Sequence, residues 1–238
     1  MEELAKIIEK DAVIAVEVIA AANSAPYKGE DSVQDLRTAI ARISAPEVQK
    51  IVPAIASRNL YESRNNQFKA LLKKLWLNSL ACAYGCRAIS DRLGNRDSDK
   101  IFLMGLTYKI GCVYLLKSID DITPDNTIYD GTELMESLHE VHTSFGAAIL
   151  NDFGFSREFS EVVRLHKWSS FEEGTKKEVL IVNLADKIAS KIRFGFFESD
   201  ADLTNVESAM ALGFNEDRLE EIAKDVKDAM KDVESVFN

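Results

Sequence analysis

The three histidines are the side chains in this sequence best suited to metal binding or acid–base chemistry. His139 and His142 are three residues apart, so they lie on adjacent turns if one helix carries both. His166 lies near the end of a helix predicted over residues 156–166, and Asp186 stands among apolar neighbours. Because imidazole and carboxylate groups suit zinc, iron and manganese, a metal site could be assembled from His142, His166 and Asp186.

A plainer interpretation of the same residues needs no metal. The histidines would be partly exposed, and Asp186 would pair with a nearby base. Three bases follow it closely in the sequence: Lys187, Lys191 and Arg193. The candidate metal ligands are far apart along the chain, and such long separations carry little specificity. Spacing alone therefore favours the plainer interpretation.

The three cysteines offer a second possible chemistry. Cys82 and Cys86 are four residues apart on a predicted helix, and Cys112 lies elsewhere. This spacing can serve a metal, but no second pair nearby completes a four-ligand set. We therefore expect small buried side chains in a reducing compartment. The sequence contains no Gly-rich phosphate loop after a strand and no Gly-x-Ser-x-Gly motif, so its enzymatic signals are weak.

Net charge and hydropathy limit the classes of partner that the protein could bind. The 238 residues carry a net charge of −10, and the part from Glu198 onward holds twelve acidic and four basic residues. Nucleic-acid binding needs a basic face, which this sequence lacks. The apolar stretch over residues 12–22 contains Glu17 and is too short to span a bilayer. We expect a cytoplasmic protein that binds neither nucleic acid nor membrane.

Helical periodicity dominates, and no segment alternates apolar and polar residues long enough to predict a strand. The stretch over 98–119 is apolar nearly all round, which predicts one continuous helix enclosed at the centre of the molecule. The other predicted helices cover residues 11–22, 32–43, 46–55, 66–93, 132–138, 142–152, 156–166, 175–194, 204–211 and 215–237. The sequence therefore predicts an all-α fold.

Several motifs stand in a distinctive order along the chain. They are Asn23-Ser24, the segment Ser32–Ile43, Leu75–Ala83, Phe102–Gly111, Glu140–Leu150 and Val162–His166. Their order resembles the HDOD domain, the HD-related output domain of bacterial signalling proteins, over about residues 1–195. The Asn23-Ser24 pair and the segment between Gly105 and Gly111 are the most specific parts of the resemblance.

The resemblance implies an HD-like helical domain of two lobes. The N-terminal lobe would cover about residues 1–62 and the HD-related lobe about 63–195, with a polar seam near 59–67. Residues 196–238 are expected to form an acidic helical extension packed on the domain. Alternatively, the apolar stripe of its last helix would pair with another chain.

The resemblance also bears on catalysis. Related HD phosphohydrolases hold their metal with a histidine, a His-Asp pair and a later aspartate. In this sequence the corresponding positions carry Asn78, Tyr108, Lys109 and, at the last, Asp186. His142 and His166 fall where some two-metal relatives carry extra histidines. Because an ammonium at Lys109 removes a ligand and repels a cation, we expect a relict pocket with no catalytic residue, metal or cofactor.

Lys109 has three possible roles. It could form an ion pair with Asp186 and so replace the metal by a protein cation. Its ammonium group could reach solvent while its aliphatic chain packs on the core. It could also line a site for a small anion such as a nucleotide.

The function implied by the resemblance is a non-catalytic signalling domain that binds a protein partner, and association into a homo-oligomer stays open. Two alternatives stay open. The first is a residual metal-dependent phosphohydrolase, acting on nucleotides or cyclic nucleotides through His142, His166 and Asp186. The second is a sensor of a small anionic ligand near Lys109.

Overall fold

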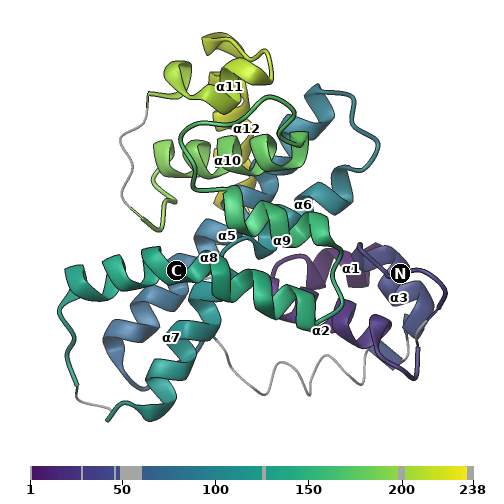
Figure 1. Ribbon diagram of the computed structural model, residues 1–238, viewed down its shortest axis with the longest axis vertical. Helices are drawn as coiled ribbons and strands as arrows, with labels where there is room; N and C mark the ends of the chain where they lie inside the picture. The colour runs from purple at the N-terminus through teal and green to yellow at the C-terminus, as the bar shows by residue number, and fades with distance from the viewer. Residues whose placement is uncertain are drawn as a thin grey trace.

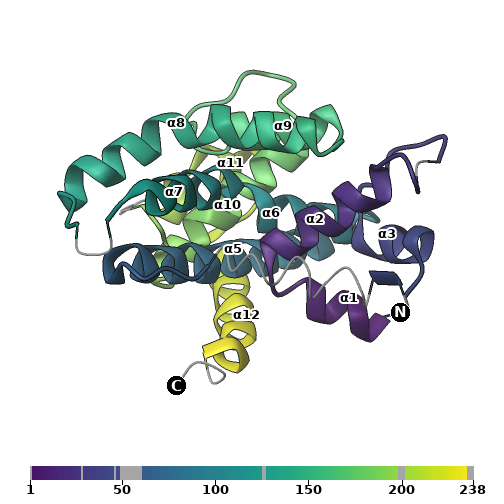
Figure 2. The ribbon, with the colours of Figure 1, turned by 90° about the horizontal axis from the view of Figure 1, so that it is seen from below.

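The structure is a computed structural model that describes residues 2–27, 29–45, 47–48, 61–124, 127–197 and 202–234. All regular elements within these ranges are helices, so the all-α fold is confirmed. Figure 2 shows a layered arrangement in which α8 and α9 lie on one side, α5 lies on the opposite side, and α6, α7 and α10 lie between them. Side chains placed on the middle layer are therefore enclosed from both sides.

The N-terminal part consists of α1 (Glu2–Ile8), α2 (Ala12–Asn23) and α3 (Leu36–Ile43), which lie together beside α6 in Figure 1. Asp11 caps α2 by accepting hydrogen bonds from two amides of its first turn, as its sequence position predicts. Most of the helix predicted over 46–55, and the first two residues of the predicted seam over 59–67, fall outside the described ranges.

The long helix α5 (Asn66–Arg92) forms the base of the layered part. It contacts α6 (Ser98–Thr107) most extensively, and Gly105 makes this close approach possible. A Cβ atom at Gly105 would lie 2.5 Å from Cys86 Sγ and 3.0 Å from Ala83 Cα. The glycine in this family-like motif therefore has a packing role.

The prediction of one continuous helix over 98–119 is wrong, because the helix breaks at Tyr108 and Lys109 before α7 (Ile110–Ile122) begins. The Thr107 hydroxyl donates to the carbonyls of Leu103 and Met104, and this side chain competes with the helical amides for those acceptors. The break turns the two side chains after Thr107 into the interior, where both are at most 1% exposed.

This apolar stretch also has the length and composition of a membrane-spanning segment. However, 78% of its most apolar window is buried inside the protein, and the break places Lys109 near its middle. Enclosed helices of a protein core have the same composition, so we assign this stretch to the core.

The two short helices predicted over 132–138 and 142–152 are one helix, α8 (Gly131–Asp152), because no glycine or proline separates them. It lies next to α7 and α9 (Arg157–Leu165). A Cβ at Gly111 would lie 2.1 Å from the His142 carbonyl oxygen, so the backbones of α7 and α8 touch at this point.

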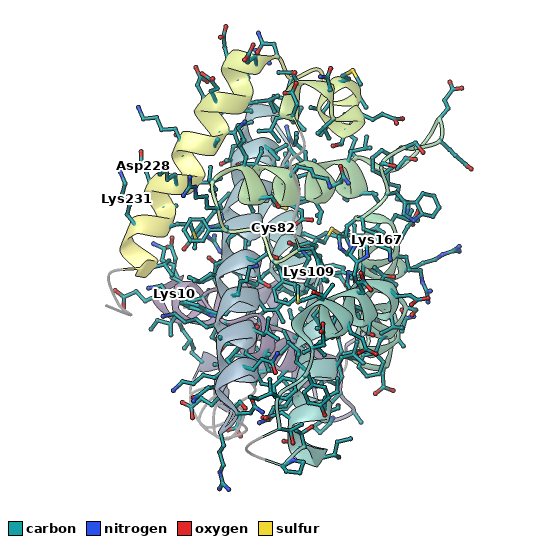
Figure 3. All side chains as sticks on the ribbon, turned by 90° about the vertical axis from the view of Figure 1, so that its left-hand side faces the viewer. Lys10, Cys82, Lys109, Lys167, Asp228 and Lys231 are labelled. Carbon is teal, nitrogen blue, oxygen red and sulfur yellow. The ribbon has the colours of Figure 1, made fainter. Side chains whose placement is uncertain are left out.

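The C-terminal part begins with α10 (Lys177–Lys191), followed by the short η1 (Leu203–Asn205) and α11 (Glu207–Ala211). The last helix, α12 (Glu216–Glu234), runs obliquely to the left of α5 in Figure 3, where its Asp228 and Lys231 are labelled. Its apolar stripe packs on α5 and α10 and is buried: Leu219, Ile222, Val226, Met230 and Val233. Arg92 on α5 also forms an ion pair with Asp225 on α12, at 2.7 Å.

Candidate relict pocket

The predicted pocket residues come from five places in the chain and meet at the break between α6 and α7. Asn78 lies on α5, Asp186 on α10, and Tyr108 and Lys109 at the break itself. Figure 3 shows Lys109 near the centre of the molecule, close to Cys82 of α5. The Lys109 cluster, defined as these four pocket residues, is therefore enclosed between the layers.

Lys109 Nζ has three protons, and three oxygen atoms surround it. It lies 2.8 Å from Asp186 Oδ1, 2.9 Å from Tyr108 Oη and 3.1 Å from Asn78 Oδ1. Asn78 is held in this orientation because its Nδ2 donates to the Phe194 carbonyl at 2.8 Å. All three donors of the ammonium are thus used within the chain.

Tyr108 closes the ring of contacts. Its hydroxyl lies 2.6 Å from Asp186 Oδ1 and 2.7 Å from Asn78 Oδ1, and it has one proton to donate. The charged carboxylate is the stronger acceptor, so the hydroxyl donates to Asp186 while it accepts from Lys109. Burial, followed by the negative charge of Asp186, raises the pKa of Tyr108 well above its usual value, so the phenol stays protonated.

The electrostatics of the cluster favour a charged pair. Burial alone would raise the pKa of Asp186, but the Lys109 charge and the hydrogen bonds from Lys109 and Tyr108 outweigh it and hold that pKa well below its usual range. The side chains of Lys109 and Asp186 are 2% and 16% exposed. A protein cation therefore neutralises the carboxylate, which is the first of the three roles predicted for Lys109.

His142 and His166 also meet, beside the Lys109 cluster. Their Nε2 atoms lie 3.4 Å apart, and the Tyr108 ring packs edge-on against the His166 ring with centroids 4.8 Å apart. Each Nδ1 lies 2.8 Å from a backbone carbonyl, that of Leu138 or Val163. Carbonyls only accept, so each Nδ1 carries the proton and both Nε2 atoms are left as facing acceptors.

The two histidines are buried, contrary to the plainer interpretation of the sequence, which placed them partly at the surface. Burial lowers the pKa of His142 to about 4, and the Lys109 charge contributes. Burial and the neighbouring His142 lower the pKa of His166 to about 3. Both imidazoles are therefore neutral at pH 7. His139, the third histidine, is exposed and lies one turn away on α8.

The cysteines are buried and unbridged, as predicted. Burial, with the neighbouring Cys86, raises the pKa of Cys82 well above its usual value, and burial raises that of Cys112 to about 12. Both side chains are therefore protonated thiols at neutral pH and act as small apolar groups.

The Asn23-Ser24 motif lies outside the pocket and joins two parts of the chain. Asn23 donates through Nδ2 to the carbonyls of Val33 and Gly154 and accepts from the Val33 amide. Ser32 also donates to the Gly154 carbonyl, whereas Ser24 bonds locally to the Ala21 carbonyl. Asn23 therefore links the N-terminal helices to the turn between α8 and α9.

The pocket does not fit the metal that HD enzymes carry. Within the described part of the chain, no three His, Cys, Asp or Glu side chains are arranged to hold a metal ion. Lys109 Nζ stands 2.8 Å from Asp186, at the place where a cation would have to lie. An ammonium there repels a divalent ion and occupies Asp186 Oδ1, which a metal would need as a ligand.

The match to a family model decides the family. The HDOD domain model matches residues 1–168 of the chain. The chain belongs to the HDOD family. The HDOD match ends shortly after His166, so α10 and the elements that follow lie outside it, although the sequence resemblance extends to about residue 195. No curated protein matches the chain.

Solved structures share this HDOD fold at low sequence identity. The MmoQ response regulator from Methylococcus capsulatus str. Bath is 20% identical, with a TM-score of 0.73 over 93% of this chain and 88% of that one. An HDOD domain protein of unknown function from Geobacter sulfurreducens is 18% identical, with a TM-score of 0.54 over 98% and 84%. A protein from Shewanella amazonensis SB2B, described as a candidate metal-dependent phosphohydrolase, is 20% identical, with a TM-score of 0.52 over 94% and 84%. These likenesses show the fold alone.

Two pocket contacts were missed from the sequence. Phe197, which follows the helix predicted over 175–194, places its ring 5.4 Å from Lys109 Nζ and 5.3 Å from the His142 ring. Asn183 on α10 donates to the His166 carbonyl at 2.6 Å. The aromatic density of the segment Phe194–Phe197 was the signal that could have revealed the first of these.

Proposed function

We propose that this HDOD protein is a non-catalytic, cytoplasmic regulatory domain that acts by binding a protein partner in a signalling pathway. The observation that carries the proposal is the ion pair between Lys109 and Asp186 at 2.8 Å. A divalent ion activates water by drawing electron density from it, and a saturated ammonium has no open coordination position for water. The pocket is thus suited to a structural role.

Two further observations support this proposal. Family membership places the chain among HD-related output domains, and one structural relative is named a response regulator. Lys109 also has all three donors occupied by Asn78, Tyr108 and Asp186, which leaves none for a bound anion. This arrangement argues against the sensor of a small anionic ligand.

Metal analysis and an activity screen test the absence of catalysis. We expect the purified protein to carry no stoichiometric manganese, iron or zinc, and to turn over none of a panel of phosphodiester and nucleotide substrates. A matched variant, Asn78→His/Tyr108→His/Lys109→Asp, restores the ligand types of an HD site and is expected to bind manganese. Stoichiometric metal together with turnover in the unmodified protein would reject the proposal.

One observation favours a second candidate function, a residual metal-dependent phosphohydrolase. The facing Nε2 atoms of His142 and His166 are acceptors 3.4 Å apart, and two nitrogen ligands of one tetrahedral zinc ion are separated by about 3.3 Å. This candidate predicts that His166→Ala removes both metal and activity, whereas His139→Ala, at the exposed histidine, leaves them intact. Unchanged metal content and activity in His166→Ala would eliminate it.

A further inference from the structure

The segment after α10 folds back over the Lys109 cluster. This segment, Ile192–Phe197, is called the strap below. Arg193 adopts a left-handed conformation with φ 72°, and the Phe194 amide bonds back to the Ala189 carbonyl at 2.8 Å. Gly195 then passes so close to α10 that a Cβ atom would lie 2.7 Å from Ser190 Oγ. The strap therefore has a fixed path across the end of α10.

The strap contacts the pocket at several points. The Phe194 carbonyl orients Asn78, and Phe196 is fully buried. The Phe197 ring lies 5.4 Å from Lys109 Nζ and packs against His142 and His139 with centroids 5.3 and 4.8 Å away. An aromatic ring thus covers the charged pair and one of the two buried histidines.

A second contact reaches the pocket from α11. Ser208 Oγ donates to Asn183 Oδ1 at 2.7 Å, and Asn183 Nδ2 donates to the carbonyls of His166 and Trp168 at 2.6 and 3.0 Å. Ser208 and Asn183 are at most 1% exposed. This hydrogen-bonded chain fixes the backbone of His166, whereas Phe197 packs on the ring of His142.

Both contacts come from residues that follow the part matched by the family model, so the HDOD match does not assign them. Water that reached Lys109 would compete for its donors and weaken its attraction to Asp186, because a dry environment strengthens such pairs. We propose that the strap and α11 form an intramolecular clamp that holds the pocket shut, and that its release exposes Lys109 and the histidine pair. Whether the pocket is closed or open would then depend on how the strap and α11 pack against it.

Amine labelling of the full chain, read peptide by peptide by mass spectrometry, tests the clamp. In the unmodified protein we expect Lys109 to react at least about a hundredfold more slowly than Lys6 and Lys231, whose side chains are 66% and 67% exposed. Phe197→Ala is expected to raise the Lys109 rate about tenfold or more, because labelling of a buried group follows the population of the open form. Ser208→Ala, which cuts the second contact, is expected to raise it several-fold.

The matched control is Phe145→Ala, the same substitution at a ring that is 38% exposed on α8. Thiol labelling of Cys86, buried between α5 and α6, reports global unfolding in the same samples. The clamp is rejected if Lys109 of the unmodified protein reacts as fast as Lys6, or if Phe197→Ala behaves like Phe145→Ala. A parallel rise at Cys86 would equally reject it, because the whole fold would then be opening.

Discussion

At the scale of single residues, Lys109 and Asp186 form a buried ion pair at the centre of the pocket. Two charges removed from water lose hydration, and their attraction repays this loss only when the geometry is good and the remaining donors are satisfied. Here all three Lys109 donors have acceptors, and Asp186 also accepts from Tyr108. The pair is therefore tolerated as a unit, and each partner depends on the other.

Removal of one partner is expected to destabilise the fold strongly. Lys109→Met leaves Asp186 without its cation, and we expect a loss of about 3 kcal/mol or more in the free energy of unfolding. Lys109→Met/Asp186→Leu removes both charges and is expected to recover most of that loss. Urea unfolding at pH 7.5 measures both variants, and a loss below about 1 kcal/mol in the single variant would contradict the ion-pair assignment.

The buried histidines predict sensitivity to acid. Their folded pKa values of about 4 and 3 lie below the ordinary value of 6.5, so the unfolded chain binds more protons and stability falls as the pH drops below about 6.5. Between pH 7.5 and pH 5 we expect a loss of about 2 kcal/mol for each histidine. Urea unfolding across this range in the presence of a chelator measures it. A similar pH slope in His142→Leu/His166→Leu would contradict the prediction.

Some residues of the pocket could be predicted from the sequence, and others could not. Asn78, Tyr108, Lys109 and Asp186 were grouped by resemblance to HD enzymes, and the structure brings them within hydrogen-bonding distance. Their spacing could not have shown this, because long-range contacts have no local signature. Phe197 was missed since the residues around it lack helical periodicity, and its role depends on the path set by the left-handed Arg193.

At the scale of elements, helix crossings depend on glycines that leave no room for a side chain. Gly111→Ala would place a Cβ 2.1 Å from the His142 carbonyl oxygen and 2.7 Å from the Gly146 amide nitrogen. Because both neighbours are backbone atoms, α7 and α8 must separate, and we expect a loss of about 2 kcal/mol or more.

The control for this prediction is Gly131→Ala at the start of α8. A Cβ there meets no atom within 4 Å, and alanine favours the helix. Thermal unfolding of the two variants compares them directly, and equal melting temperatures would contradict the close crossing of α7 and α8.

The helices themselves were largely predictable, because apolar periodicity and caps such as Asp11 and Asn65 are local signals. The error in the middle of 98–119 has a clear cause. Apolar composition on all sides indicates that a segment is buried but does not show whether its helix is continuous, so the turn at Tyr108 and Lys109 was missed.

At the scale of the whole molecule, a polar junction around Asn23 is one of the links between the N-terminal helices and the part that holds the pocket. Asn23 makes three hydrogen bonds there, two to the Val33 backbone and one to the Gly154 carbonyl. Gln34 adds a bond from the Ser156 amide at 2.9 Å. The packing of α2 against α6 supplies apolar contact, but these hydrogen bonds fix its position relative to the turn between α8 and α9.

Asn23→Ala is therefore expected to loosen the link without unfolding α2. The loss of bonds to part-buried backbone groups should cost about 1–3 kcal/mol. Hydrogen exchange should accelerate at residues 31–35 and 153–156 and remain unchanged around Lys109, since the Lys109 cluster makes none of these bonds. Ser24→Ala is the matched control, because its hydroxyl bonds only to the Ala21 carbonyl within α2. Equal exchange in the two variants would show that the Asn23 bonds do not hold the N-terminal helices in place, and acceleration around Lys109 would show that the junction and the pocket open together.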